Sequence, residues 1–142
     1  MSKLIFVNLP VADLNADKAF YEAIGFTKNP QFTDETAACM VLSETIHVML
    51  LTHEKFSQFT PKAIADARQV SEVLICVSED SREGVDRITE NALAAGGREP
   101  RERQDYGFMY GRSFEDPDGH IWEVVWMDLE AATAAQPVAV DA

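Results

Sequence analysis

The sequence predicts a mixed α+β fold made of two successive β-α-β-β-β modules. In each half of the chain an apolar, β-branched run comes first, an amphipathic helical pattern follows, and short extended segments come last. This order occurs twice, and the repeat is the strongest architectural signal in the sequence. At 142 residues the chain is long enough to bury the core of one domain. We therefore expect a single domain over residues 1–128, with module one at 4–52, a linker at 53–70, module two at 71–128 and a tail at 129–142.

The first module begins with a predicted strand over residues 4–9. Pro10 should end this strand, because proline cannot donate a hydrogen bond to a sheet. Asp13 or Asn15 can cap the helix that follows, and Gly25 is placed to end it. The apolar residues of this helix recur at a 3.6-residue period, which predicts a buried face made of Ala16, Ala19, Phe20, Ala23 and Ile24.

Two extended runs, at residues 37–42 and 46–51, predict a hairpin that completes the first module. The linker that follows is polar. Within it, Thr60 and Pro61 form a favourable N-cap and first-turn pair, so we expect a short helix through Ala67.

The second module repeats this order. Residues 72–77 predict a strand, Asp80 or Ser81 can cap the next helix, and Gly96 can end it. The module closes with a hairpin around residues 116–119, whose order Asp-Pro-Asp-Gly is typical of a type I turn. The expected buried face of the second helix comprises Val85, Ile88, Ala92 and Ala95.

Composition excludes several classes of function. A formal net charge of −12 at pH 7 argues against nucleic acid or an anionic membrane surface as a partner, and it suits a neutral or cationic ligand. No apolar run reaches membrane-spanning length, and the apolar start of the chain is too short for a signal peptide, so we expect a cytoplasmic protein. Cys39 and Cys76 have no Cys or His at metal-binding spacing, and we expect both to be buried free thiols.

The last predicted strand places one carboxylate among apolar neighbours. Glu123 follows the turn glycine by four residues and shares a face with Ile121 and Val125, so it should have either a partner or a function. His120 is expected to be exposed beside the turn. On the strand before the turn, alternate residues could present an aromatic wall with a cationic tip: Tyr106, Phe108, Tyr110 and Arg112. Ordinary sheet packing explains Phe108 equally well.

Three segments resemble the vicinal oxygen chelate superfamily, which includes glyoxalase I, bleomycin-resistance proteins and extradiol dioxygenases. They are LPVADL at 9–14, AFYEAIGF at 19–26 and DPDGHIWE at 116–123. Shorter matches are similar to a bacterial subgroup of predicted lactoylglutathione lyases, and these are MLLT at 49–52, SRE at 81–83 and FMYGRSF at 108–114.

The resemblance implies a glyoxalase-like fold in which the sheets of two paired modules curve around a cup. Pairing within or between chains closes the cup, and members are usually homodimers. In metal-dependent members a divalent ion is held by four ligands, one on the first and one on the last strand of each module. That ion polarises vicinal oxygens of a substrate for isomerisation, epimerisation or oxygenation.

Only part of that ligand set is present here. Glu123 stands at the last ligand position, and Glu72 stands at the first-strand position of module two, where either can bind a hard cation. The two positions of module one carry Phe6 and Leu50, which cannot bind a metal. His47 should lie on the opposite face of its strand from Leu50, and it becomes a ligand only if a bulge shifts the register.

Two functional hypotheses follow. In the first, the protein is a glyoxalase-like lyase or isomerase in which Glu123 or Glu72 acts as metal ligand or base. In the second, it is a metal-free protein of the bleomycin-resistance kind that binds or sequesters a planar or cationic small molecule between aromatic residues. No phosphate-binding glycine loop is present, so we expect no nucleotide cofactor. The candidate ligand-binding residues are Phe6, Asn8, Leu50, Tyr106, Phe108, Tyr110 and Arg112.

Overall fold

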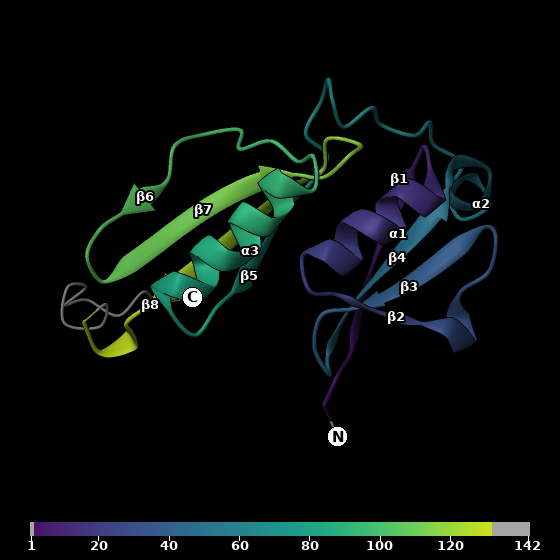
Figure 1. Cartoon of the computed structure of the whole chain (residues 1–142). Coiled ribbons are helices and arrows are strands. Elements are labelled where there is room, and N and C mark those ends of the chain that lie inside the picture. The colour runs from purple at the N-terminus through teal and green to yellow at the C-terminus, as the bar shows by residue number, and fades with distance from the viewer. Residues whose placement is uncertain (1, 132–142) are drawn as a thin grey trace, which may run out of the picture.

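A computed structural model of the chain describes residues 2–131 and contains two four-stranded mixed sheets (Figure 1). The strand orders are β1-β4-β3-β2 and β5-β8-β7-β6, and neither sheet closes on itself. The predicted α+β class with two β-α-β-β-β modules is confirmed. The elements are β1 (Ile5–Val11), α1 (Leu14–Ala23), β2 (Thr27–Asn29), the 3-10 helix η1 (Pro30–Phe32), β3 (Ala37–Val41), β4 (Ile46–Thr52), α2 (His53–Ser57), β5 (Leu74–Ser78), α3 (Arg82–Ala94), β6 (Gln104–Asp105), β7 (Met109–Glu115) and β8 (Ile121–Met127).

The first strand of each module lies at the edge of its sheet. β1 pairs in parallel with β4, and β5 pairs in parallel with β8, while the other pairs are antiparallel. The prediction that Pro10 ends the first strand is wrong, because β1 continues to Val11 with Pro10 opposite Leu51. An edge strand needs hydrogen bonds on one side only, so the missing N–H of a proline is tolerated there.

Helix α1 begins at Asp13, whose Oδ1 accepts a 3.1 Å hydrogen bond from the backbone N–H of Ala16. Its buried face differs from the predicted one. Phe20 and Ile24 are buried as expected, but the three alanines are exposed, and Asp17 is buried instead. The large side chains of α1 determine which face meets the sheet, because they bury far more apolar area than alanine does.

The predicted helix in the linker is absent. Instead, α2 starts directly after β4, where Thr52 Oγ1 accepts a 3.2 Å bond from the backbone N–H of Lys55. Thr60 Oγ1 accepts a 3.1 Å bond from the N–H of Lys62, which forms a local turn without a helix behind it. Helix α3 agrees better with its prediction, since Ser81 caps it and most of the expected apolar face is buried.

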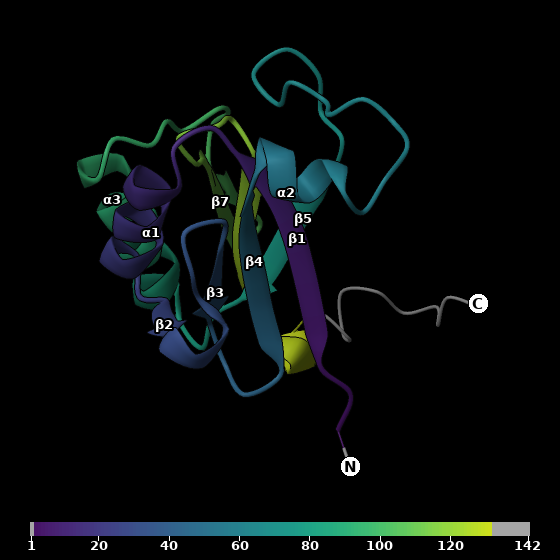
Figure 2. The same cartoon turned by 90° about the vertical axis from the view of Figure 1, so that its right-hand side faces the viewer.

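One hydrophobic core extends through both modules, with side chains from both sheets and from α1 and α3. The two helices lie side by side, on the same side of the sheets (Figure 2). We call the opposite face of the two sheets the open face. Its strand positions include Phe6, Asn8 and His47 in module one, and Cys76 and Glu123 in module two. None of the helices in residues 2–131 is both long and apolar enough to cross a bilayer. Of the predicted tail, residues 132–142 lie outside the described residues.

The modules meet at the turn between β7 and β8, which Asp116 organises. Its Oδ1 accepts backbone hydrogen bonds from Asp118 (3.0 Å) and His120 (2.9 Å). Its Oδ2 accepts a 2.6 Å bond from the Tyr21 hydroxyl of α1, which in turn accepts a 2.9 Å bond from the indole N–H of Trp122. The turn of module two is thereby bonded to the helix of module one.

Two further bonds cross the same boundary. Asp118 Oδ1 accepts a 2.8 Å bond from the backbone N–H of Ala12. The Nε2 of His120 lies 2.9 Å from the carbonyl oxygen of Pro10, which can only accept, so Nε2 is the protonated nitrogen. The expectation that His120 is exposed is therefore wrong, and its side chain is 1% exposed. We call the cross-module bonds of Tyr21, Asp116, Asp118, His120 and Trp122 the junction clasp.

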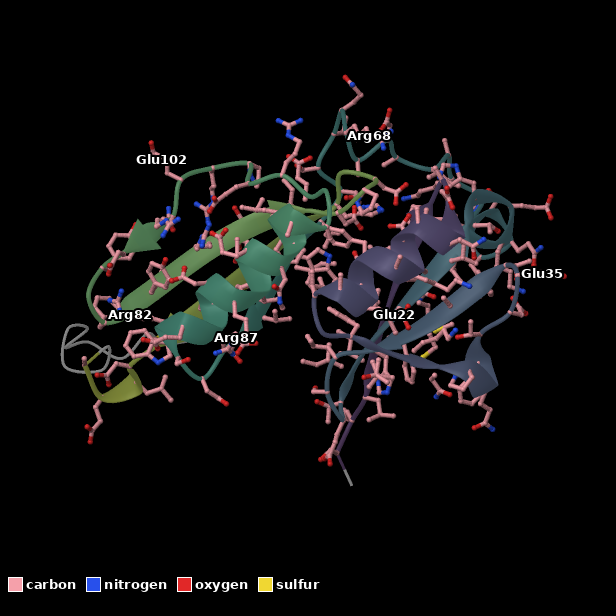
Figure 3. The ribbon with its side chains drawn as sticks, in the orientation of Figure 1. Glu22, Glu35, Arg68, Arg82, Arg87 and Glu102 are labelled. Atoms are coloured by element: carbon pink, nitrogen blue, oxygen red, sulfur yellow. The ribbon has the colours of Figure 1, made fainter. Side chains whose placement is uncertain are left out.

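The linker packs against this turn. Gly119 has a φ of +96°, and a Cβ at this position would lie 2.9 Å from both the carbonyl oxygen of Ala67 and the nitrogen of Arg68. The guanidinium of Arg68, above the junction in Figure 3, donates to the carbonyl of Pro117. Only glycine satisfies both the backbone conformation and the close approach of the linker.

Asp17 lies beside the clasp on the buried face of α1, with 1% of its surface exposed. Its Oδ1 and the Oδ2 of Asp118 both lack a hydrogen-bond donor, and the two carboxyl groups are within hydrogen-bonding distance of each other. Burial, and next the contact with Asp118 and nearby negative charge, raise the pKa of Asp17 to about 9. One proton between the two groups satisfies both oxygens, so Asp17 is protonated at neutral pH.

Replacing Tyr21 by Phe should lower the free energy of unfolding by about 1–3 kcal/mol, because it leaves Asp116 Oδ2 and the Trp122 indole without their partner. Urea denaturation measures the change. Tyr106→Phe is the control, because the Tyr106 side chain is 59% exposed. Equal stability of the two variants would show that the clasp adds nothing to the fold.

Replacing Asp17 by Asn should stabilise the protein above neutral pH. The folded state holds the Asp17 proton up to a pKa of about 9, whereas an ordinary aspartate loses it near 3.8. The folded state therefore binds more protons between these values, and the wild-type free energy of unfolding falls as pH rises through that window. The amide can still donate to Asp118, so we expect a gain on the order of 2–4 kcal/mol at pH 8.

Denaturation at pH 5 and pH 8 measures this effect, and Glu22→Gln, on the exposed side of α1 (Figure 3), is the matched control. An Asp17→Asn variant with an unchanged pH slope would show that Asp17 is ionised in the native protein.

Candidate functional site

The open face of module one carries an aromatic platform where the resemblance places a metal ligand. Phe6 on β1 lies opposite His47 on β4, and their rings stack with centroids 4.6 Å apart and planes 24° apart. Asn8 lies opposite Met49 one pleat further along. This edge of the open face therefore presents two stacked rings and the amide of Asn8, which is exposed.

The expected position of Leu50 is corrected. Leu50 has no exposed surface and packs in the core beneath α1, as Val48 does, so neither lines the open face. His47 shares the face of Phe6 with no bulge in the β1–β4 pairing. The alternation of side chains along β4 was predicted correctly, but the wrong set of alternate residues was expected to face the ligand. Both sets are largely apolar, so the sequence does not distinguish the two faces of this strand.

The open face of module two is charged. Glu123 Oε2 accepts a 2.7 Å hydrogen bond from Arg101 Nη2, and the Glu123 side chain is 22% exposed. Its neighbours in the sheet are Cys76 on β5 and Ser113 on β7. The Ser113 hydroxyl is buried and has no hydrogen-bond partner. Arg101 is the functional candidate that sequence reasoning missed, because it comes from the irregular segment before β6 and no periodicity points to it.

Cys76 corrects a second expectation. The structure confirms that both cysteines are free, but Cys39 is buried whereas Cys76 is exposed. Partial burial, and next the charge of Glu123, raise the pKa of the Cys76 thiol. This exposed thiol is therefore a weak nucleophile at neutral pH, which fits no catalytic role.

The predicted aromatic wall turns away from the open face. Tyr110 is buried toward α3, and its hydroxyl donates a 2.6 Å bond to Asp86 Oδ1. Arg112 is 4% exposed and donates to Glu99 and Asp86, and these acids, with Glu90, raise its pKa further. Of the other two members of that row, Tyr106 is exposed and Phe108 is half-buried. The open-face positions of β7 are Met109, Gly111 and Ser113.

Glu72 and Glu123 have separate surroundings. Glu72 Oε2 lies 3.5 Å from Nδ1 of His120, beside the junction clasp. Their roles as metal ligands or catalytic acids remain predictions, and the two carboxylates have different partners, His120 and Arg101.

A different set of residues lies close enough to hold a metal ion. Ligand atoms of Asp116, Asp118 and His120 lie within 4.8 Å of one another, and their D-x-D-x-H spacing is the signal that could have identified them. Most of these atoms already have partners. Asp116 accepts three hydrogen bonds, and Asp118 Oδ1 and His120 Nε2 bond to module one. Asp118 Oδ2 shares the proton of Asp17, which leaves His120 Nδ1. The donor set fits a structural clasp better than a complete metal centre.

Comparisons with known proteins agree with this architecture. Residues 3–43 match the family described as bleomycin resistance protein-like N-terminal. No curated protein matches the chain. A hypothetical protein from S. aureus is similar in structure, with a TM-score of 0.73, 27% identity, and coverage of 89% of this chain and 95% of that one.

Two further solved structures carry family names. A glyoxalase/bleomycin resistance protein/dioxygenase family enzyme from Burkholderia phytofirmans has a TM-score of 0.72 and 20% identity, covering 89% of this chain and 99% of its own. A lactoylglutathione lyase from Agrobacterium tumefaciens has a TM-score of 0.66 and 19% identity, covering 91% and 96%. The chain therefore has the fold of the vicinal oxygen chelate superfamily, and the match of its first module supports the resemblance that the motifs indicated.

Proposed function

We propose that the protein binds a small molecule in a cup that the open faces of its two sheets form, and that a second copy of the chain closes this cup. The observation that supports this most is the exposure of large apolar side chains on strands of the open face: Phe6 is 50% exposed, Leu74 57% and Met127 40%. Monomeric proteins rarely leave sheet faces of this kind in water. β1 and β5, each at one edge of its sheet, border this face.

A cavity of about 450 Å³ on the first module supports the binding role. Asn8, Leu51, Phe56, Phe59 and Thr60 line it, so α2 and the residues after it form a wall above β1 and β4. This volume is within the range of ligand pockets, and the lining combines aromatic rings with one amide. The cavity suits a flat, largely apolar group that accepts or donates one hydrogen bond.

Binding without a metal centre fits the donor set of the open face. Phe6 stacks on His47 at one expected ligand position, and Glu123 is bonded to Arg101 at another. Transition-metal sites use three or four N, S or O ligands, and these residues do not supply such a set in one chain. The two free thiols suit the reducing cytoplasm, where we place the protein.

The binding role predicts ligands that need no divalent ion. A thermal-shift screen of planar aromatic compounds, run with EDTA, should find stabilising hits. Phe56→Ala should weaken a hit by about tenfold, because it removes an aromatic wall of the cavity. Phe32→Ala is the control, because Phe32 is 60% exposed and does not line the cavity. Hits that disappear with EDTA would contradict the metal-free proposal.

The second copy gives a separate prediction. Leu74→Glu should convert a dimer into a monomer in sedimentation equilibrium, because a charge would then be buried in the contact between the open faces. Val70→Glu, at a linker residue of similar exposure (54%), should leave the dimer intact. A wild-type protein that is monomeric at all concentrations would contradict the closed cup.

Glu123 supports a second candidate, a glyoxalase-like lyase or isomerase reaction. Its carboxylate lies on the open face and, once released from Arg101, could accept a proton from a carbon beside a carbonyl group. Glu123→Gln should then abolish turnover of the hemithioacetal of glutathione and leave the fold intact. Unchanged turnover would remove Glu123 from the mechanism.

A further inference from the structure

The Arg101–Glu123 pair differs from the other ion pairs in residues 2–131. Arg112 and Arg103 pair with acids of α3 and the segment after it, Arg82 stacks on the rings of Tyr110 and Trp126, and His120 belongs to the junction. Arg101 and Glu123 meet instead on the open face, where Arg101 is 50% exposed and Glu123 22%. They are therefore charged groups that a ligand in the cup would meet.

Ser113 gives an independent sign that this place is built for a ligand. Ser113 lies opposite Glu123 in the β7–β8 pairing, its side chain is on the same face, and only 1% of its surface is exposed. Its hydroxyl has no hydrogen-bond partner. Buried hydroxyl groups nearly always have a partner, so the Ser113 hydroxyl is available to a polar group that enters beside Glu123.

The charge balance of the pair selects the ligand class. A ligand with only a negative group would take Arg101 and leave the Glu123 carboxylate unpaired at a partly buried position, which is costly. A ligand with only a positive group would take Glu123 and release Arg101, which loses a charge-assisted bond without replacing it. A ligand with both groups replaces both halves of the pair.

We propose that the ligand of the cup is zwitterionic, with an ammonium and a carboxylate group a few ångströms apart as in an α-amino acid, joined to an apolar ring. The carboxylate pairs with Arg101, the ammonium pairs with Glu123 and donates to the Ser113 hydroxyl, and the ring lies against the aromatic residues of module one. This inference rests on the proposed binding function, because the closed cup brings a face of module one over a face of module two.

In this arrangement the half-exposed Arg101 moves from the carboxylate of Glu123 to the carboxylate of the ligand. Its segment, residues 98–103, lies between α3 and β6 and is mostly exposed, so the long side chain can swing away from Glu123 without disturbing a strand. When the ligand enters, Arg101 exchanges one carboxylate for another and keeps its charge paired. Both charges of the pair are therefore compensated once the ligand is bound.

Three probes that share a phenyl ring test the proposal: L-phenylalanine carries both charges, phenethylamine carries only the ammonium, and 3-phenylpropionate carries only the carboxylate. Titration calorimetry at low salt should show phenylalanine binding at least about tenfold more tightly than either relative, which corresponds to one added charge-assisted contact. Arg101→Gln should remove the advantage over phenethylamine, and Glu123→Gln the advantage over 3-phenylpropionate. Arg103→Gln, in the same segment, should remove neither.

The outcomes separate this inference from the binding function itself. If phenethylamine binds as tightly as phenylalanine and Arg101→Gln strengthens both, the site selects cations and the zwitterion proposal is wrong. If no phenyl probe binds while the aromatic screen yields metal-independent hits, the cup binds ligands but not through this pair, which also overturns the proposal. If neither set of compounds binds, the proposed function fails with it.

Discussion

The carboxylate of Asp116 is the group on which the arrangement of the two modules depends. It closes its own turn through two backbone N–H groups, and it anchors the Tyr21 hydroxyl, which in turn holds the indole of Trp122. Each of these groups is buried, so each needs its partner. Because the anchor is a side chain from one module and the hydroxyl comes from the other, the same carboxylate both closes the hairpin and joins the modules.

This docking decides where a ligand can bind. The helices of both modules pack together on one side of the sheets, and their side chains share a core with residues from both sheets (Figure 2). The opposite face therefore retains side chains that α1 and α3 do not cover, and within residues 2–131 α2 borders one end of it. Module one offers stacked rings and an amide there, and module two offers a charge pair beside an unpaired hydroxyl. The two faces differ in chemistry although the modules share one topology.

Sequence reasoning predicted the modules, the final hairpin and the caps of the main helices, since periodicity and turn chemistry are local signals. It failed where burial depends on distant partners. Asp17 is charged in the sequence, yet Asp118 from the other module allows its burial as a protonated acid. Tyr110 and Arg112 share one face of β7, as predicted, but that face is the one toward α3, where acidic residues on and after the helix bind them. Glu123 could be placed on a face, whereas its partner Arg101 comes from a segment without periodicity.

The junction clasp joins the two halves of the chain independently of the peptide that connects them. Residues 58–66 connect the modules without forming a helix or strand, while the clasp and the shared core hold the modules together by non-covalent contacts. The peptide connection is thus not the main source of cohesion between the halves. A break in this connection would therefore leave the two halves associated through the clasp and the shared core.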